Sequence, residues 1–266
     1  MRHAELSYGN ANDRAHGLYD EIRAEAFGTD IGQTGWLTVN ELTAFVSWLG
    51  LGERSRVLDL ACGAGGTLLR MIGLVGCRGA GVDEDGRAIR EANEARKRMG
   101  LRGRAWFVVV ESGARLPYHD ASFDAVMCID AIDHFPDRLL ALTECRRVVK
   151  PGGRVLFTDP LIVSGPVSNE ELAIRCLGRT SVVAPAGVDE ACIADAGLEL
   201  LWCEDTTASV AEISGRWHAA RTTRAGSLRP LEGERAFEEH QQCLMLTEQL
   251  ARERRISRIA YLAQRA

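Results

Sequence analysis

Hydrophobic and polar positions follow two alternating periods between residues 56 and 159. Five short apolar runs have the length of a buried β-strand: 56–61, 79–83, 105–110, 123–130 and 154–159. Three segments between them have apolar positions three or four residues apart, the spacing of one helix face: 67–75, 86–99 and 137–149. Strands that alternate with helices indicate βαβ units, and therefore a parallel sheet with helices on both faces.

Two regions outside this pattern are helical in character and have no sheet of their own. Residues 1–50 end at a glycine-rich stop, and residues 207–254 lie between the strand candidates 198–205 and 256–263. We therefore predict that both regions form a helical cap over one end of the sheet. The predicted organisation is as follows: an N-terminal cap at 1–50, a core at 51–206, an inserted cap at 207–254 and a final strand at 255–266.

Composition adds what the protein is not expected to do. A net charge of −5 argues against a nucleic-acid backbone as the main partner. Eight cysteines occur singly, without the paired spacing of a zinc or redox motif, so no metal is expected. No stretch approaches the length of a membrane span, and the N-terminal residues lack the apolar core of a signal peptide. We expect a cytoplasmic protein with no membrane partner.

The first strand candidate ends at Asp59 and runs directly into a glycine-rich turn, Ala61-Cys62-Gly63-Ala64-Gly65-Gly66. Glycines allow the backbone to approach a ligand closely, and the helix that follows offers unpaired N–H groups to an anion. About 20 residues later the second strand candidate ends at Asp83, which is placed to accept hydrogen bonds from both hydroxyls of a ribose. The pattern therefore predicts a site for a nucleoside that carries a charged group.

Three ligands compete for such a turn. A dinucleotide site requires a third glycine where this chain has Leu68, and a phosphate-binding P-loop requires a Gly-Lys-Ser/Thr sequence that is absent. The remaining ligand is an adenosyl group whose methionine tail reaches the glycine-rich turn.

Four motifs in order carry a family resemblance: VLDLACGAGG at 57–66, GVDEDG at 81–86, ESGARLPYHDASFDAV at 111–126 and VVKPGGRVLFTD at 148–159. They resemble the class I S-adenosylmethionine (SAM)-dependent methyltransferases. Two further stretches, IDAIDHFPDR at 129–138 and FGTDIGQTGWLTVNEL at 27–42, resemble the sterol, sarcosine and phosphoethanolamine methyltransferases. The resemblance implies a Rossmann-like α/β sheet of about seven strands, mostly parallel and with the last one antiparallel, and SAM as the cofactor.

The resemblance also implies a cofactor site. Asp59, Gly63 and Gly65 would surround the methionine part, and Asp83 would hold the ribose. Glu111 would contact the adenine amine, with Ser112 as the alternative if the loop register differs by one. Ile129 and Asp130 would pass under the sulfonium. The chain departs from many relatives at Ala61, where they have glycine, and its third motif has Glu111 in place of the usual aspartate.

Residues after the fourth strand candidate are candidates for catalysis. His134 can act as a general base because its ordinary pKa suits neutral pH, or it can only position the substrate. Asp130 is a second candidate, since its carboxylate can stabilise a cationic amine. Asp133 can bind substrate in the same way or serve as an N-cap.

Aromatic and amide residues of the predicted caps are candidates for substrate binding: Tyr19, Gln33, Trp36 and Trp217. The alternative for the aromatic residues is packing in a hydrophobic core. We predict methyl transfer from SAM to a nitrogen, oxygen or carbon atom of a small acceptor. The alternatives are a non-catalytic SAM-binding protein, a SAM fold with other chemistry, and a nucleic-acid methyltransferase. The oligomeric state stays open, a homodimer included.

Overall fold

The computed structural model describes residues 13–33, 35–177 and 181–266. The prediction of a cap over residues 1–50 therefore includes residues 1–12, which lie outside the described residues. Strands in the described part are β1 (Arg56–Leu60), β2 (Arg78–Asp83), β3 (Ala105–Val109), β4 (Phe123–Cys128), β5 (Val149–Val163), β6 (Ala184–Pro185), β7 (Leu198–Asp205) and β8 (Ile256–Arg265). Helices are α1 (Asp13–Phe27), α2 (Val39–Leu49), α3 (Gly66–Val75), α4 (Gly86–Arg98), a 3₁₀ turn η1 (Ile132–His134), α5 (Arg138–Val148), α6 (Asn169–Arg175), α7 (Val188–Asp195), α8 (Thr207–Thr223), α9 (Ala225–Glu232) and α10 (Glu234–Arg252).

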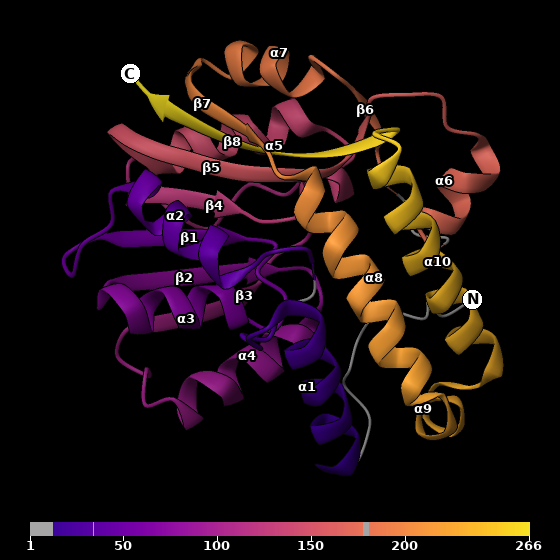
Figure 1. Cartoon of the computed structure of the whole chain (residues 1–266). Helices are drawn as coiled ribbons and strands as arrows, with labels where there is room; N and C mark the ends of the chain where they lie inside the picture. The colour runs from indigo at the N-terminus through magenta and orange to yellow at the C-terminus, as the bar shows by residue number, and fades with distance from the viewer. Residues whose placement is uncertain (1–12, 34, 178–180) are drawn as a thin grey trace.

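The strands form one mixed sheet with the order β3-β2-β1-β4-β5-β8-β7 (Figure 1). Neighbours from β3 to β5 pair in parallel, and β8 runs antiparallel to both β5 and β7. The predicted α/β class and the antiparallel last strand are therefore confirmed. The short strand β6 adds a parallel pairing to the end of β5. Sequence patterns did not indicate β6, because two paired residues are too few to show a period.

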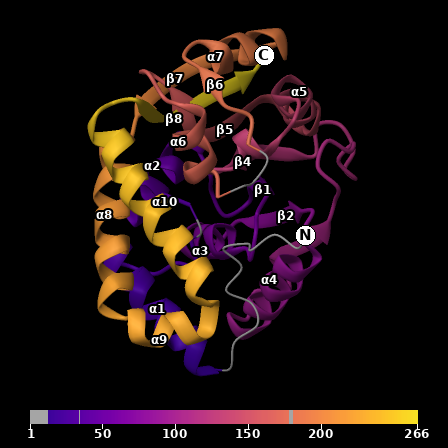
Figure 2. The same cartoon turned by 90° about the vertical axis from the view of Figure 1, so that its right-hand side faces the viewer.

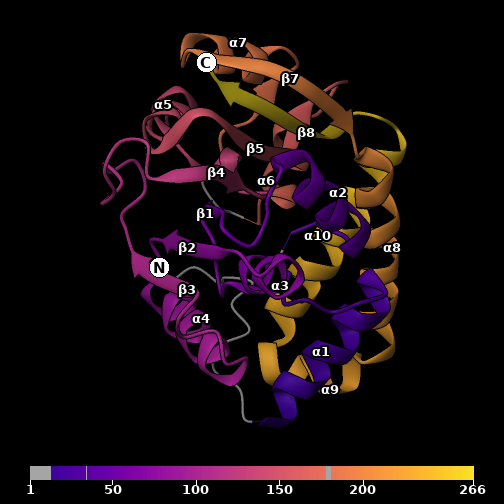
Figure 3. The same ribbon diagram turned by 90° about the vertical axis from the view of Figure 1, so that its left-hand side faces the viewer.

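Helices cover both faces of the sheet, as Figures 1 and 3 show. Leu42 of α2, Leu68 of α3 and Ile89 of α4 belong to the buried cluster on one face. Leu142 of α5 and Ile193 of α7 belong to the cluster on the other. The central strands β1, β2 and β4 are therefore removed from water on both faces, which explains why they read as nearly continuous apolar runs. The edge strands β3 and β7 keep exposed residues.

The helices α1, α8, α9 and α10 form a separate layer at one end of the sheet, whereas α2, which the predicted cap at 1–50 includes, packs on a face of the sheet instead. In Figure 2, α8 and α10 lie side by side, with α1 and α9 beside them. They share a hydrophobic cluster of their own, which includes Ile22 of α1, Ile213 and Trp217 of α8, and Phe237 of α10. A core shared between α1 and the α8–α10 segment joins two parts of the chain that are far apart in sequence. We call α1, α8, α9 and α10 the cap.

Candidate functional site

The glycine-rich turn after β1 has the backbone conformation that the sequence pattern requires. Ala61, Gly63 and Gly65 all have positive φ angles, of 59°, 52° and 77°. The left-handed region costs a non-glycine residue about 1–2 kcal/mol. Ala61 therefore has a strained backbone conformation, which the glycine found at this position in many relatives adopts without strain.

Asp83 ties the turn to the end of β2. Its carboxylate accepts hydrogen bonds from the N–H of Gly63 at 2.8 Å and the N–H of Asp85 at 2.9 Å. Each carboxylate oxygen can accept a further hydrogen bond. The side chain thus holds the turn and retains acceptor capacity for a ligand hydroxyl.

Asp59 lies close to Asp83 and is almost completely buried, with 3% of its surface exposed. Burial raises the pKa of the Asp59 carboxyl well above its usual range, and the negative charge of Asp83 raises it further. Within the described ranges no lysine, arginine or histidine lies within 4 Å of either carboxylate. Two carboxyls without a cation fit a ligand that brings its own positive charge and hydroxyls, and SAM carries both.

The segment before α2 lies directly over the glycine-rich turn. A side chain at Gly66 would come within 2.3 Å of the carbonyl oxygen of Ile31. Gln33 holds this segment in shape, because its amide accepts from the N–H of Ile31 at 2.7 Å and donates to the carbonyl of Thr29 at 3.1 Å. Gln33 is 2% exposed and does not line the cavity described below. The structure therefore gives it a bracing position instead of the predicted contact with substrate.

The adenine end of the predicted site is open. Glu111 and Ser112 are both exposed, and the N–H of Ser112 donates to Glu84 at 3.3 Å. Ile129 packs against the cluster on the α2–α4 face. Which of Glu111 and Ser112 contacts the adenine stays a prediction.

Asp130 adopts a left-handed conformation (φ 53°) and is the centre of a buried network. Its carboxylate accepts hydrogen bonds from the backbone N–H of Trp36 at 2.6 Å, from Thr158 Oγ1 at 2.7 Å and from Arg258 Nε at 2.6 Å. Arg258 is completely buried and also pairs with Glu41 at 2.5 Å. These partners occupy the carboxylate that we expected to act in catalysis, so Asp130 is placed to position the segment around Trp36.

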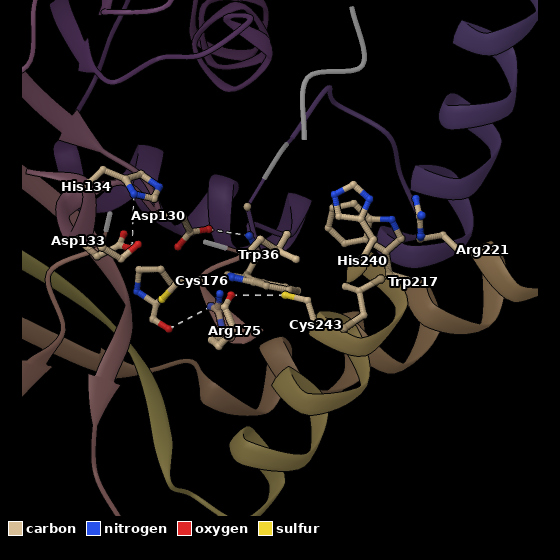
Figure 4. A pocket seen from close by; sticks show the side chains of 15 residues that line it. Trp36, Asp130, Asp133, His134, Arg175, Cys176, Trp217, Arg221, His240 and Cys243 are labelled. Carbon is tan, nitrogen blue, oxygen red and sulfur yellow. Dashed lines mark hydrogen bonds and ion pairs between the residues drawn. The ribbon is translucent and has the colours of Figure 1, made fainter. Parts of the chain in front are cut away.

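A cavity lies between the sheet end and the cap. Figure 4 shows the side chains around it. The lining comes from the segment before α2, from η1, from the end of β5, from α6 and the residues after it, and from α8 and α10: Gly35, Trp36, Asp130, Asp133, His134, Pro160, Arg175, Cys176, Leu177, Ser181, Trp217, Arg221, His240, Cys243 and Leu244. The predicted cap regions contribute to the wall, together with α6, which was not predicted.

His134 and Asp133 lie at one end of the cavity (Figure 4). The Nδ1 atom of His134 is 3.7 Å from Asp133 Oδ2, and the His134 side chain is 41% exposed. Asp133 is buried, which raises the pKa of its carboxyl, whereas the nearby His134 lowers it. The N-cap of α5 is Asp137, which accepts from the N–H of Leu140 at 2.8 Å. The N-cap alternative for Asp133 was therefore wrong.

The two tryptophans predicted to bind substrate both line the cavity and are also nearly buried. Trp36 is 8% exposed and Trp217 is 3% exposed, and their rings meet edge to face at 6.0 Å. The guanidinium of Arg175 lies 5.3 Å from the centre of the Trp36 ring, so the cation that this ring meets belongs to the protein itself.

Tyr19 does not line the cavity. Its hydroxyl donates a hydrogen bond to Glu232 at 2.9 Å. Substrate contact is therefore not its position in this structure. Four further residues line the cavity from α6, the residues after it, α8 and α10, and no sequence pattern indicates them: Arg175, Ser181, Arg221 and His240. None of them belongs to a local motif, so only the three-dimensional arrangement reveals them.

Comparison with known proteins agrees with this geometry. Residues 58–157 match a family described as a methyltransferase domain. The chain is 33% identical over 211 residues to 27-O-demethylrifamycin SV methyltransferase of Amycolatopsis mediterranei. This match spans 74% of this chain and 77% of the relative. Within the described residues, no helix is both long enough and apolar enough to cross a membrane.

Two solved structures share the fold. Phosphoethanolamine N-methyltransferase 2 of Haemonchus contortus, in complex with SAM, has a TM-score of 0.79 at 20% identity, over 96% of this chain and 57% of that one. The [4+2]-cyclase SpnF has a TM-score of 0.75 at 20% identity, over 94% of this chain and 92% of that one. Because a methyltransferase and a cyclase both have this fold, the fold alone does not identify the reaction.

Proposed function

The chain belongs to the SAM-dependent methyltransferases of small molecules, and we propose that its acceptor binds in the cavity between the sheet end and the cap. The observation that carries this proposal is that one cavity is lined by both Asp130, at the expected sulfonium position, and the Asp133–His134 pair. An acceptor in this cavity lies between the cofactor end of the sheet and a side chain that can take its proton.

The residues that would hold SAM are those around the glycine-rich turn. Asp59, Gly63 and Gly65 would surround the methionine part, Asp83 the ribose, and Glu111 or Ser112 the adenine. Bound SAM supplies an electrophilic methyl group on a positively charged sulfur. Alignment of the acceptor with that group can lower the barrier by about 7–11 kcal/mol without any base. The cavity walls are therefore the main catalytic device.

His134 adds proton transfer when the acceptor atom is a hydroxyl oxygen or a protonated nitrogen. A neutral imidazole can accept that proton, and the carboxylate of Asp133 at 3.7 Å stabilises the imidazolium that results. Segments of the cap and the N-terminal region keep water away from the reacting atoms.

Titration with S-adenosylhomocysteine in a calorimeter tests the cofactor site. We expect Asp83→Ala to weaken binding by about 1.5–3 kcal/mol, the range for hydrogen bonds that involve a charged group. Glu199→Ala is the matched control, because Glu199 is exposed on β7. Equal affinity of the folded Asp83→Ala variant and the control would show that the nucleoside binds elsewhere. Incubation with methyl-labelled SAM and a metabolite extract then tests turnover by transfer of label to a small molecule.

A further inference from the structure

Four buried polar atoms without a hydrogen-bond partner in the described part of the chain belong to residues that line this one cavity. They are Asp133 Oδ1, Arg175 Nε, Trp217 Nε1 and His240 Nδ1. Buried donors and acceptors in folded proteins nearly always have partners. A cavity wall that holds several unpaired polar atoms is therefore built to receive polar atoms of a ligand.

Three of these atoms fall at the two ends of the cavity, and the fourth belongs to Arg175, which lies against the Trp36 ring between them. Asp133 lies beside His134, where we place the methylated atom. Trp217 of α8 and His240 of α10 lie at the cap end, and Figure 4 shows them away from His134 with Trp36 between. The cap end is thus available to a part of the acceptor that is remote from the reaction.

Trp217 is held rigidly at the cap end. Its ring contacts Phe27 edge to face at 5.4 Å and Trp36 at 6.0 Å, and 3% of its surface is exposed. The indole N–H can only donate a hydrogen bond. A ligand group that satisfies it must therefore present a lone pair.

Charges at the cap end are already balanced. Arg221 donates to both carboxylate oxygens of Glu232, at 3.0 and 2.7 Å, and to Gln241 at 3.1 Å. Glu232 also accepts from Tyr19, and His240 Nδ1 lies 3.6 Å from it, beyond hydrogen-bond distance. Among the described residues that line this end of the cavity, there is no unpaired carboxylate that would attract an ammonium group. The group that fits is a carbonyl or hydroxyl oxygen.

We propose that the acceptor carries a carbonyl or hydroxyl oxygen at the end remote from the methylated atom, and that Trp217 Nε1 donates a hydrogen bond to it beside His240. This inference rests on the proposed function, since it assumes that the cavity holds the acceptor. It makes Trp217 and His240 specificity-determining residues, and it selects oxygen-bearing acceptors over those that end in a hydrocarbon or an ammonium group.

Three phenols with one carbon skeleton test this selection: 4-(4-hydroxyphenyl)butan-2-one, 4-butylphenol and 4-(4-hydroxyphenyl)butan-2-amine. Each is titrated into the complex with S-adenosylhomocysteine, with ¹⁵N-labelled indoles observed by NMR. We expect the ketone to bind at least about tenfold more tightly than the other two, because a site built for a hydrogen bond rejects analogues that lack the group. The Trp217 indole signal, assigned by its loss in Trp217→Phe, should move with the ketone only.

Trp217→Phe and His240→Phe should each reduce the ketone's advantage, while Trp202→Phe on exposed β7 should retain it. Unchanged affinity for S-adenosylhomocysteine shows that each variant is folded. The inference is overturned if the three phenols bind equally, if none binds at millimolar concentration, or if the advantage survives in Trp217→Phe. Failure of S-adenosylhomocysteine itself to bind would instead overturn the proposed function and this inference with it.

Discussion

Asp59 shows how a single buried carboxyl can prepare a site for a cation. It is 3% exposed, its pKa is raised by burial and then by Asp83, and no cationic side chain of the described residues compensates it. The group is therefore protonated over a wider pH range than an ordinary aspartate. A ligand ammonium beside it would favour the ionised form and release a proton.

The first prediction concerns this proton. Calorimetric titration of S-adenosylhomocysteine at several pH values above the ordinary pKa of an aspartate, in buffers of different ionisation enthalpy, should show proton release on binding. Asp59→Asn should abolish the release and weaken binding, because the amide cannot ionise. Asp195→Asn on α7, far from the turn in sequence and structure, is the control. Binding heats that do not depend on the buffer would contradict the proposed position of the methionine ammonium.

His134 is the residue for which the structure supports proton transfer best. Once an acceptor is known, we expect His134→Gln to lower kcat by about 10²–10⁴-fold, the usual contribution of a general base. KM and the affinity for S-adenosylhomocysteine should change little, because glutamine retains polar contacts at the site. A loss confined to KM would show that His134 only positions the substrate.

At the scale of elements, one buried arginine joins the N-terminal segment to the sheet. Arg258 of β8 pairs with Asp130 after β4 and with Glu41 of α2, while Asp130 accepts from the N–H of Trp36. Glu41 also completes the capping box of α2 by accepting from the N–H of Thr38. The start of α2, the cavity wall at Trp36 and the last strand therefore depend on the same guanidinium.

Replacement of Arg258 by methionine tests this junction. It leaves two buried carboxylates without their cation, which is expected to cost about 3–5 kcal/mol of unfolding free energy. Arg252→Met is the matched control, because Arg252 is exposed on α10 and pairs with Glu248 one turn away.

Chemical denaturation measures both variants, and hydrogen exchange should rise at residues 35–41 in Arg258→Met. If the Arg258→Met variant folds poorly, Glu41→Gln offers a milder test of the same contact. Equal stability of Arg258→Met and Arg252→Met would show that the network does not hold the segment.

At the scale of the whole molecule, Glu232 joins four helices of the cap. It pairs with Arg221 of α8, accepts from Tyr19 of α1 and lies near His240 of α10. Burial raises the pKa of Glu232, but the nearby His240 and the hydrogen bonds from Arg221 and Tyr19 outweigh burial and bring the pKa down to about 2. The Glu232 carboxyl therefore stays ionised to a lower pH in the folded protein than in the unfolded chain, where its pKa is near 4.5.

A lowered carboxyl pKa stabilises the folded protein above the unfolded-state pKa and loses that effect as the pH falls towards the folded-state pKa. We expect Glu232→Gln to reduce the unfolding free energy by about 2–3 kcal/mol at pH 7, with the difference from wild type shrinking between pH 4.5 and pH 2. Denaturation series across this range measure it. Glu238→Gln, at an exposed pair with Arg229, should show little difference at any pH. A difference that is independent of pH would rule out the charge as its cause.

Asp189 has the opposite effect on how stability depends on pH. Burial and Asp159 raise the pKa of Asp189 to about 7, so this group favours the folded state less as the pH rises from about 4 to 7. Because the same acids are present in both proteins, the comparison of Glu232→Gln with wild type cancels their contribution.

Local patterns were enough to predict the order of strands and helices in the core and the position of the glycine-rich turn. Strands β1 and β2 and the helices α3 and α4 follow from apolar periods within ten or so residues. Gly63 and Asp83 belong to turns at strand ends, and parallel pairing of β1 with β2 then brings them to one edge. These features depend on short-range spacing and on the chirality of the crossover, both of which are visible in sequence.

Tertiary structure decided what the acceptor meets. Asp130 was assigned to catalysis by its place after β4, but Arg258, which is 128 residues further along the chain, occupies its carboxylate. Arg175, Trp217 and His240 come from three helices that share no motif, and their polar atoms lie at one cavity only after the cap packs on the sheet. Apolar periodicity determines which face of each helix is buried, whereas the partner of a polar side chain depends on which distant segment packs against it.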